Sequence, residues 1–209
     1  MITPPEATVE RAWKRGLELG RFKAVDDLLA HNVEAFTGMQ SILFGRALDP
    51  KVNVHFEFLD NEVPRGEVPL TAAFGWSGEM NILDVKRMLD MERYRHIDVK
   101  ARSPLALYDS EKAQGGPFNT QFLAKCIRQF RQLNLADRRT GRIYAHFENS
   151  RLRWVDNDAL ACADFEPDVR AALAHLVPQL FNAETSRAPN SVFLRPERFH
   201  TIGRWLQDA

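Results

Sequence analysis

The spacing of apolar residues and the signals of helix ends predict that the chain begins with two helices. From Phe22 to about Arg46, apolar residues recur at steps of three and four, which places them on one face of a helix, and an earlier helix is expected up to about Leu19. Two prolines near the start suit the first turn of the first helix, and Gly20 suits its end. Residues 1–47 are therefore expected to form a helical N-terminal portion.

The pattern then changes to the alternation that is typical of strands. Residues 51–59 alternate between apolar and polar side chains, as expected of a strand with one buried face, and residues 70–76 predict a second strand. Residues 81–95 return to helical spacing, with Asn81 as the expected N-cap. A short strand over residues 96–101 is expected next, before a long connection that contains glycine and proline.

The clearest element in the sequence is the helix that follows this connection. Its apolar face runs through residues 122–133, and cationic and amide side chains occupy the other faces. Residues 142–155 predict a β-hairpin that turns at Asn149 and Ser150, with Trp154 facing inward beside the apolar side chains of the first strand.

A further helix is expected from about Pro167, followed by a C-terminal appendage over residues 183–209. Within the appendage, residues 192–194 predict an edge strand, and a terminal helix is predicted by the spacing of Phe199, Ile202, Trp205 and Leu206. Helices outnumber strands and do not alternate regularly with them, which favours an α+β fold with a small, mostly antiparallel sheet. The length of 209 residues is consistent with a single domain.

Composition narrows the class of protein. Hydrophobic residues make up 44% of the chain and charged residues 27%, as in ordinary soluble domains. No apolar run approaches the ~18 residues of a membrane span, and no basic region followed by an apolar one opens the chain, so we expect a cytoplasmic protein without membrane contact. Cys126 and Cys162 are far apart in the sequence, which argues against a disulfide framework or a cysteine-based zinc site.

Charge is distributed unevenly along the chain. Residues 86–153 contain 15 Lys and Arg against 7 Asp and Glu, although the whole chain balances at 28 of each. The cations most crowded in sequence are Lys125, Arg128, Arg131, Arg138, Arg139, Arg142, Arg151 and Arg153. Clustered cations near Tyr144 and Trp154 suit contact with nucleic acid or with an acidic protein. They equally suit surface arginines that pair with the acidic flanks of the same chain.

A second interpretation rests on two copies of Asp-Val-Lys, which begin at Asp84 and Asp98. Two carboxylates at this separation, the second followed two positions later by Lys100, resemble the pattern of PD-(D/E)xK nucleases. That resemblance implies that Asp84, Asp98 and Lys100 hold Mg²⁺ and orient a water for phosphodiester attack. The alternative is that Asp84 stabilises a helix N-terminus and that Asp98 and Lys100 lie on the solvent side of a strand.

The tripeptide His-Phe-Glu also occurs twice, each time on a predicted strand. His55 and Glu57 would share one face of their strand, and His146 and Glu148 one face of theirs. If the two strands were neighbours, these four side chains could bind Zn²⁺ or another divalent ion. The same alternation fits a phenylalanine in the core with His and Glu in solvent.

These patterns favour a non-enzymatic binding protein, either an adaptor or a subunit of a larger complex. No phosphate-binding glycine loop and no serine-hydrolase motif is present in the sequence. We expect a basic central surface that contacts nucleic acid or an acidic protein partner and needs no cofactor. The alternative is a nuclease, and only that alternative calls for Mg²⁺.

Overall fold

The computed structural model describes residues 1–49, 51–64, 66–114, 119–182 and 191–194. The strands of its sheet are β1 (Phe56–Asp60), β2 (Leu70–Trp76), β3 (Glu79–Ile82), β4 (Gln132–Ala136), β5 (Ile143–Glu148) and β6 (Arg151–Val155). The α-helices are α1 (Pro5–Leu19), α2 (Val25–Arg46), α3 (Val85–Arg93), α4 (Gln121–Gln129), α5 (Asn157–Cys162) and α6 (Pro167–Leu176). Short 3-10 helices are η1 (Tyr94–His96), η2 (Leu105–Tyr108), η3 (Glu111–Ala113) and η5 (Pro178–Phe181).

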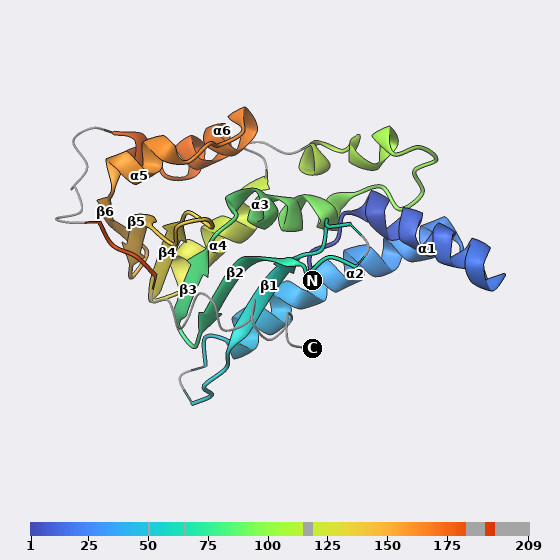
Figure 1. Ribbon diagram of the computed structural model, residues 1–209, viewed down its shortest axis with the longest axis horizontal. Coiled ribbons are helices and arrows are strands. Elements are labelled where there is room, and N and C mark those ends of the chain that lie inside the picture. The colour runs from blue at the N-terminus through green and yellow to red at the C-terminus, as the bar shows by residue number, and fades with distance from the viewer. Residues whose placement is uncertain (50, 65, 115–118, 183–190, 195–209) are drawn as a thin grey trace.

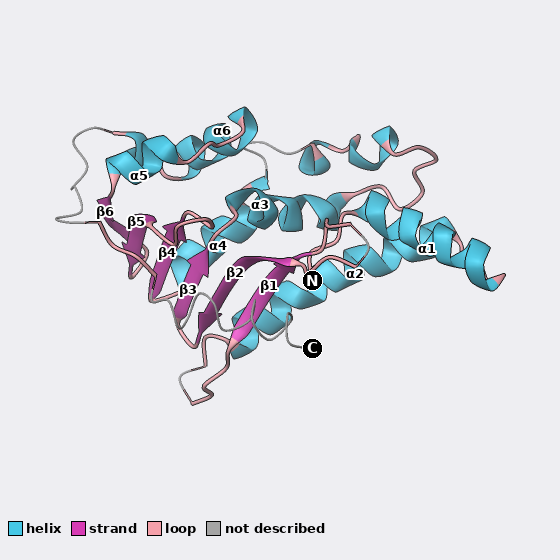
Figure 2. Ribbon diagram, in the orientation of Figure 1, coloured by secondary structure: helices cyan, strands magenta, loops and turns pink. Residues whose placement is uncertain are grey.

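The six strands lie side by side in chain order, β1 to β6 (Figure 1). Neighbouring strands are antiparallel except for β3 and β4, which are parallel. A parallel pair needs a crossover connection, and α3 and α4 lie within the one that joins β3 to β4. The sheet is therefore mostly antiparallel, and the expected α+β class is confirmed. Figure 2 shows α1 and β6 at opposite ends of the molecule.

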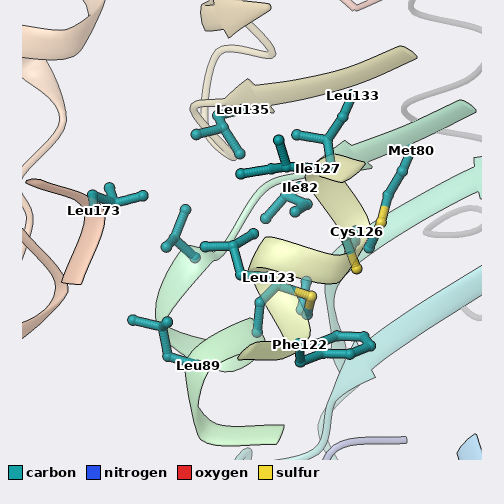
Figure 3. Packing of buried hydrophobic residues seen from close by; sticks show 14 of the residues in the cluster. Met80, Ile82, Leu89, Phe122, Leu123, Cys126, Ile127, Leu133, Leu135 and Leu173 are labelled. Carbon is teal, nitrogen blue, oxygen red and sulfur yellow. The ribbon is translucent and has the colours of Figure 1, made fainter. Parts of the chain in front are cut away.

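One face of the sheet carries the main hydrophobic core. Side chains of β3 and β4 meet the apolar face of α4, and helices α2, α3 and α6 contribute to the same cluster. Figure 3 shows this packing around Leu123 of α4, with Ile82 from β3 and Leu135 from β4 close by. Leu123 and Leu135 are fully buried, which explains why the sequence pattern of α4 is so distinct.

The opposite face carries a row of side chains that crosses all six strands. Its members are Glu57, Phe74, Asn81, Asn134, His146 and Trp154. Asn134 Nδ2 donates to Asn81 Oδ1 at 2.8 Å, and His146 Nδ1 donates to Asn134 Oδ1 at 2.7 Å. Trp154 stacks on the His146 ring, with 5.4 Å between centroids. These contacts give hydrogen-bond partners to the side chains of Asn81, Asn134 and His146, which are buried or half-buried on this face of the sheet.

The N-terminal helices agree with the sequence analysis. Helix α1 ends at Leu19, and Gly20 caps it with a left-handed φ of 68°. Helix α2 ends at Arg46, as its apolar spacing predicts. The next strand, β1, begins later than expected, at Phe56, and β2 matches residues 70–76.

The predicted helix over residues 81–95 is wrong at its start. Asn81 lies in β3, and α3 begins after Asp84, whose Oδ1 accepts a hydrogen bond from the Arg87 amide at 3.1 Å. Strand β3 forms because its backbone pairs with β2 on one side and β4 on the other. The second of these partners is about fifty residues away in the chain, so the local pattern does not reveal it.

Two other predicted elements also differ. The strand over residues 96–101 is replaced by the end of η1 and a turn in which Asp98 Oδ1 accepts a hydrogen bond from the Lys100 amide. The predicted helical face through Leu133 is interrupted, since α4 ends at Gln129 and Leu133 belongs to β4. The three-residue spacing of Ile127, Phe130 and Leu133 is a coincidence of a helix followed closely by a strand.

The β-hairpin turns where it was expected, at Asn149 and Ser150, which have φ of 49° and 66°. Trp154 does not face the main core, because a bulge beside Phe147 places it opposite His146 on the other face of the sheet. Helix α6 begins at Pro167 as predicted. Near the C-terminus, an isolated bridge between Arg142 and Phe193 takes the place of an edge strand.

The terminal helix predicted from Phe199 to Leu206 lies outside the described residues. Among those that are described, no helix combines the length and the apolar composition that a membrane span requires.

Candidate binding surface

The acidic flanks of the sequence supply carboxylates to several cations of the basic segment. Arg142 forms a two-pronged pair with Asp156, with Nε and Nη2 each 2.8 Å from a carboxylate oxygen. Asp156 is 7% exposed and also caps α5 through the Ala159 amide. Arg138 Nη2 lies 2.6 Å from Asp84 Oδ2. Both arginines lie near the open end of the β5–β6 hairpin, and both are partly buried and paired with a carboxylate of the same chain.

Three more of the eight cations form looser pairs. Arg153 Nε lies 2.9 Å from Glu148 Oε2. Arg131 reaches Glu79 at 3.7 Å, and Arg139 reaches Asp137 at 3.7 Å. The arginine side chains of these pairs are 47 to 80% exposed, so solvent screens them and each contributes little to stability.

Lys125 contacts an aromatic ring instead of a carboxylate. Its Nζ lies 4.2 Å from the centre of the Phe44 ring, so the ammonium group sits over the face of an aromatic side chain of α2. This contact ties α4 to α2 and draws Lys125 away from the other cations.

Arg128 and Arg151 are the remaining two, and both are exposed. Neither forms an ion pair with a carboxylate of the described residues. The turn of the hairpin holds them together, because Ser150 Oγ donates to the Arg128 carbonyl oxygen at 2.8 Å. The Asn149 amide donates to the Arg131 carbonyl oxygen, also at 2.8 Å. The tip of the hairpin is therefore fixed to the end of α4, with one arginine on each element.

Between these elements and the end of α6 lies a groove of about 740 Å³, which we call the tip groove. Arg128, Ser150 and Arg151 lie along it, and its apolar lining consists of Ala124, Ile127, Phe147, Leu152, Leu176 and Val177. Gln179 and Asn182 complete the lining. The volume is in the range of sites that take small ligands or short peptide segments. Guanidinium groups above an apolar floor can bind carboxylates that are accompanied by apolar side chains.

A second hollow, which the sequence analysis missed, lies where the parallel strands β3 and β4 end. It has a volume of about 670 Å³ and is lined by both acidic and basic side chains. Arg87 Nε lies 2.9 Å from Asp60, Arg87 Nη1 lies 3.1 Å from Asp90, and Arg87 also pairs with Glu62. Burial by itself would lower the pKa of Arg87, but the three carboxylates outweigh burial and raise that pKa. The charges of this cleft largely neutralise one another.

The residues of the nuclease alternative are kept apart. Asp84 caps the start of α3, whereas Asp98 and Lys100 follow the end of η1. The intervening helical residues span about 18 Å. Asp84 is paired with Arg138, and the Asp98 carboxylate is bonded to its own turn. The helix-capping interpretation of Asp84 therefore describes its contacts.

The four residues of the metal alternative are also separated. His55 precedes β1 and lies against Trp76, with ring centroids 4.9 Å apart, while His146 lies on β5. Three strands separate β1 from β5, a distance of about 19 Å at ~4.8 Å per strand. Among the residues that the structure describes, no group of three or more His, Cys, Asp or Glu could hold a metal ion.

Burial instead favours the neutral forms of His55, Glu57 and His146. It lowers the pKa of His55, and it lowers the pKa of His146 although the nearby Glu148 opposes that change. Burial raises the pKa of Glu57, against a hydrogen bond from Thr71 that stabilises the carboxylate.

Comparisons of this chain with models of protein families, with curated proteins and with solved structures find no match. The functional interpretation therefore rests on the site itself.

Proposed function

We propose that this protein is a binding protein, an adaptor or a subunit of an assembly, that captures an acidic segment of a partner protein in the tip groove. The observation that carries this proposal is that Arg128 and Arg151 both line one groove with an apolar floor, with no carboxylate of the described residues neutralising them. Cations that a fold leaves unpaired on a fixed frame are available to a partner.

The lining of the tip groove favours a protein segment over a nucleic acid. Ile127, Phe147 and Val177 are at most 7% exposed and form an apolar floor that fits aliphatic or aromatic side chains. Nucleic-acid binding would call for several phosphate contacts and for exposed aromatic faces on which bases stack. Tyr144 is only 3% exposed, and Trp154 is stacked on His146. Two arginines and an apolar floor match alternating carboxylates and apolar side chains better.

Binding of defined probes tests the proposal. A fluorescent peptide of alternating Glu and Leu is titrated with the protein at 50 and 200 mM salt, beside duplex DNA and single-stranded RNA of similar charge. We expect the peptide to bind, and the double variant Arg128→Glu/Arg151→Glu to weaken its binding about tenfold, as for a loss of ~1.4 kcal/mol. Salt should weaken binding as well, since the arginines are exposed.

Arg139→Glu is the matched control, because Arg139 is exposed and lies outside the tip groove. Its peptide affinity should stay within about twofold of the unmodified protein, since a distant exposed charge contributes little. Equal affinity of the double variant and the unmodified protein for the peptide would contradict the proposal. Tighter binding of DNA or RNA through the same two arginines would mean that the ligand of the tip groove is a nucleic acid and not an acidic protein segment.

A further inference from the structure

Exposed apolar side chains gather at the end of the molecule that is opposite β6. Twelve large apolar residues are exposed among the described residues, and five of them fall between residues 13 and 25. These five are Trp13, Leu17, Leu19, Phe22 and Val25, with 43 to 66% of each residue exposed. A cluster of this kind on a protein surface marks an interaction site more often than isolated apolar residues do.

Two side chains of the cluster, Trp13 and Phe22, pack against each other. The Trp13 and Phe22 rings lie 4.9 Å apart, and Phe22 packs over Gly16 of α1. A Cβ at Gly16 would come within 2.5 Å of the Phe22 ring, so this close approach requires glycine. A preformed surface loses little conformational entropy when it binds a partner.

Beside the cluster lies an apolar groove of about 750 Å³ between α1, the start of α2 and residues 101–107. We call it the N-terminal groove. Its α1 wall carries Glu6, Glu10 and Trp13. Its other wall carries Arg102 and Pro104, and the adjoining Leu105 is 87% exposed. Glu10 also forms an exposed ion pair with Lys14 of the same helix at 2.5 Å, and Glu6 adds a second carboxylate to the α1 wall. Each wall therefore combines apolar side chains with charge, and the α1 wall is acidic whereas the other wall is basic.

We infer that the partner of the N-terminal groove is a second copy of this chain, which forms a two-fold symmetric dimer. A two-fold axis along the groove sets the α1 wall of each copy against the 101–107 wall of the other. Trp13 then meets the apolar Pro104 and Leu105 of the second copy, and Glu10 faces its Arg102. A uniformly acidic or uniformly basic partner would meet repulsion from one of the two walls.

This inference does not depend on the proposed function. Because α1 and β6 lie at opposite ends of the molecule, such a dimer leaves both tip grooves open (Figure 1). A partner with two acidic segments would then gain avidity from the dimer without any further contact.

Sedimentation equilibrium of the full chain between 1 and 200 µM tests the dimer. We expect the mass to rise toward twice the 24.0 kDa of the chain. Trp13→Glu and Leu105→Glu each change one wall, and each should raise the dissociation constant about 30-fold or more, as expected when an apolar anchor is lost. Ile42→Glu is the control, because Ile42 is 67% exposed on α2 but does not line the groove, and it should leave the mass unchanged.

A charge exchange tests the pairing of the walls. Glu10→Arg and Arg102→Glu should each weaken the dimer about tenfold, and the double variant should return to within about threefold of the unmodified protein. A chain that stays monomeric at 200 µM would overturn the inference. A dimer whose dissociation constant is unchanged by Trp13→Glu and Leu105→Glu would also overturn the inference. The same holds for a double charge variant that dimerises more weakly than either single charge variant. Circular dichroism of each variant verifies that it is folded.

Discussion

The base and the tip of the β5–β6 hairpin are both rich in arginine, yet their arginines are used differently. At the base, Arg142 is locked to the buried Asp156, and nearby Arg138 is paired with Asp84. At the tip, Arg128 and Arg151 line a groove without such carboxylates. Both groups belong to the same basic stretch of sequence. The contrast teaches that folding, by bringing in acidic residues from outside that stretch, decides which cations remain available.

The comparison fails if arginines that are paired with carboxylates inside the fold do not stabilise it. Arg87, which lines the same cleft as Asp84 and Arg138, is the most demanding test. The Arg87 side chain is 13% exposed and pairs with two carboxylates that are each 7% exposed, those of Asp60 and Asp90. Arg87→Met keeps most of the volume but leaves the Asp60 carboxylate without its ion-pair partner and Asp90 with Lys86 alone, so we expect a loss of about 3–5 kcal/mol in the free energy of unfolding. Urea denaturation measures this loss.

The control for Arg87→Met is Arg139→Met, since the Arg139 side chain is 80% exposed. Its effect should stay below about 0.5 kcal/mol. Similar effects of the two variants would mean that the buried ion pairs of Arg87 contribute no more to the free energy of unfolding than an exposed arginine does.

Substituting one arginine at the base and one at the tip sharpens the comparison. Arg142→Ala leaves the Asp156 carboxylate without its two-pronged partner, and we expect a loss of about 2–3 kcal/mol because Arg142 itself is partly exposed. Arg151→Ala should change stability by less than about 0.5 kcal/mol. Peptide binding should show the reverse order, with Arg151→Ala weakening it more than Arg142→Ala. If Arg142→Ala weakened binding more while the fold stayed intact, the roles of base and tip would have to be exchanged.

The smallest expected effect is a dependence of stability on pH at the polar row of the sheet. Burial lowers the pKa of His146 in the folded state, so between that pKa and 6.5 the unfolded chain binds more protons than the folded one. The contribution to stability is therefore complete above pH 6.5 and is lost as the pH falls through this window.

Denaturation at pH 5.5 and 7.5 measures the dependence, and His146→Gln should reduce the difference between the two values. His55 has the same sign and keeps part of the dependence in that variant. If the difference in stability between pH 5.5 and 7.5 were unchanged in His146→Gln, the pH dependence would not come from His146.

Local patterns were sufficient wherever an element shows its own periodicity. Helices α1 and α2, strand β2 and the hairpin turn at Asn149 follow from apolar spacing and turn residues. Strands β3 and β4 could not be found in this way, because both are short and each is stabilised by pairing with the other across a long crossover. The sequence therefore predicted the class of the fold but not the parallel pair at the centre of the sheet.

The candidate site was predictable only as a set of residues. The cluster of eight cations includes Arg128 and Arg151, but nothing local separates them from Arg138 and Arg142. Their different roles depend on Asp84 and Asp156, which lie outside the basic stretch and reach it only in the folded chain. The exposed aromatic pair of Trp13 and Phe22 was missed for a related reason, since apolar spacing predicts a buried face and does not reveal that nothing in the described structure covers it.

The central claim is that the tip groove is where the protein captures its partner. Hydrogen exchange measured by mass spectrometry, with and without the Glu-Leu peptide, tests it most directly. Binding in the tip groove predicts slower exchange in residues 124–128, 147–152 and 176–182 and no change near residues 84–87 and 138–142. Protection confined to the base, or to the N-terminal groove, would contradict the claim.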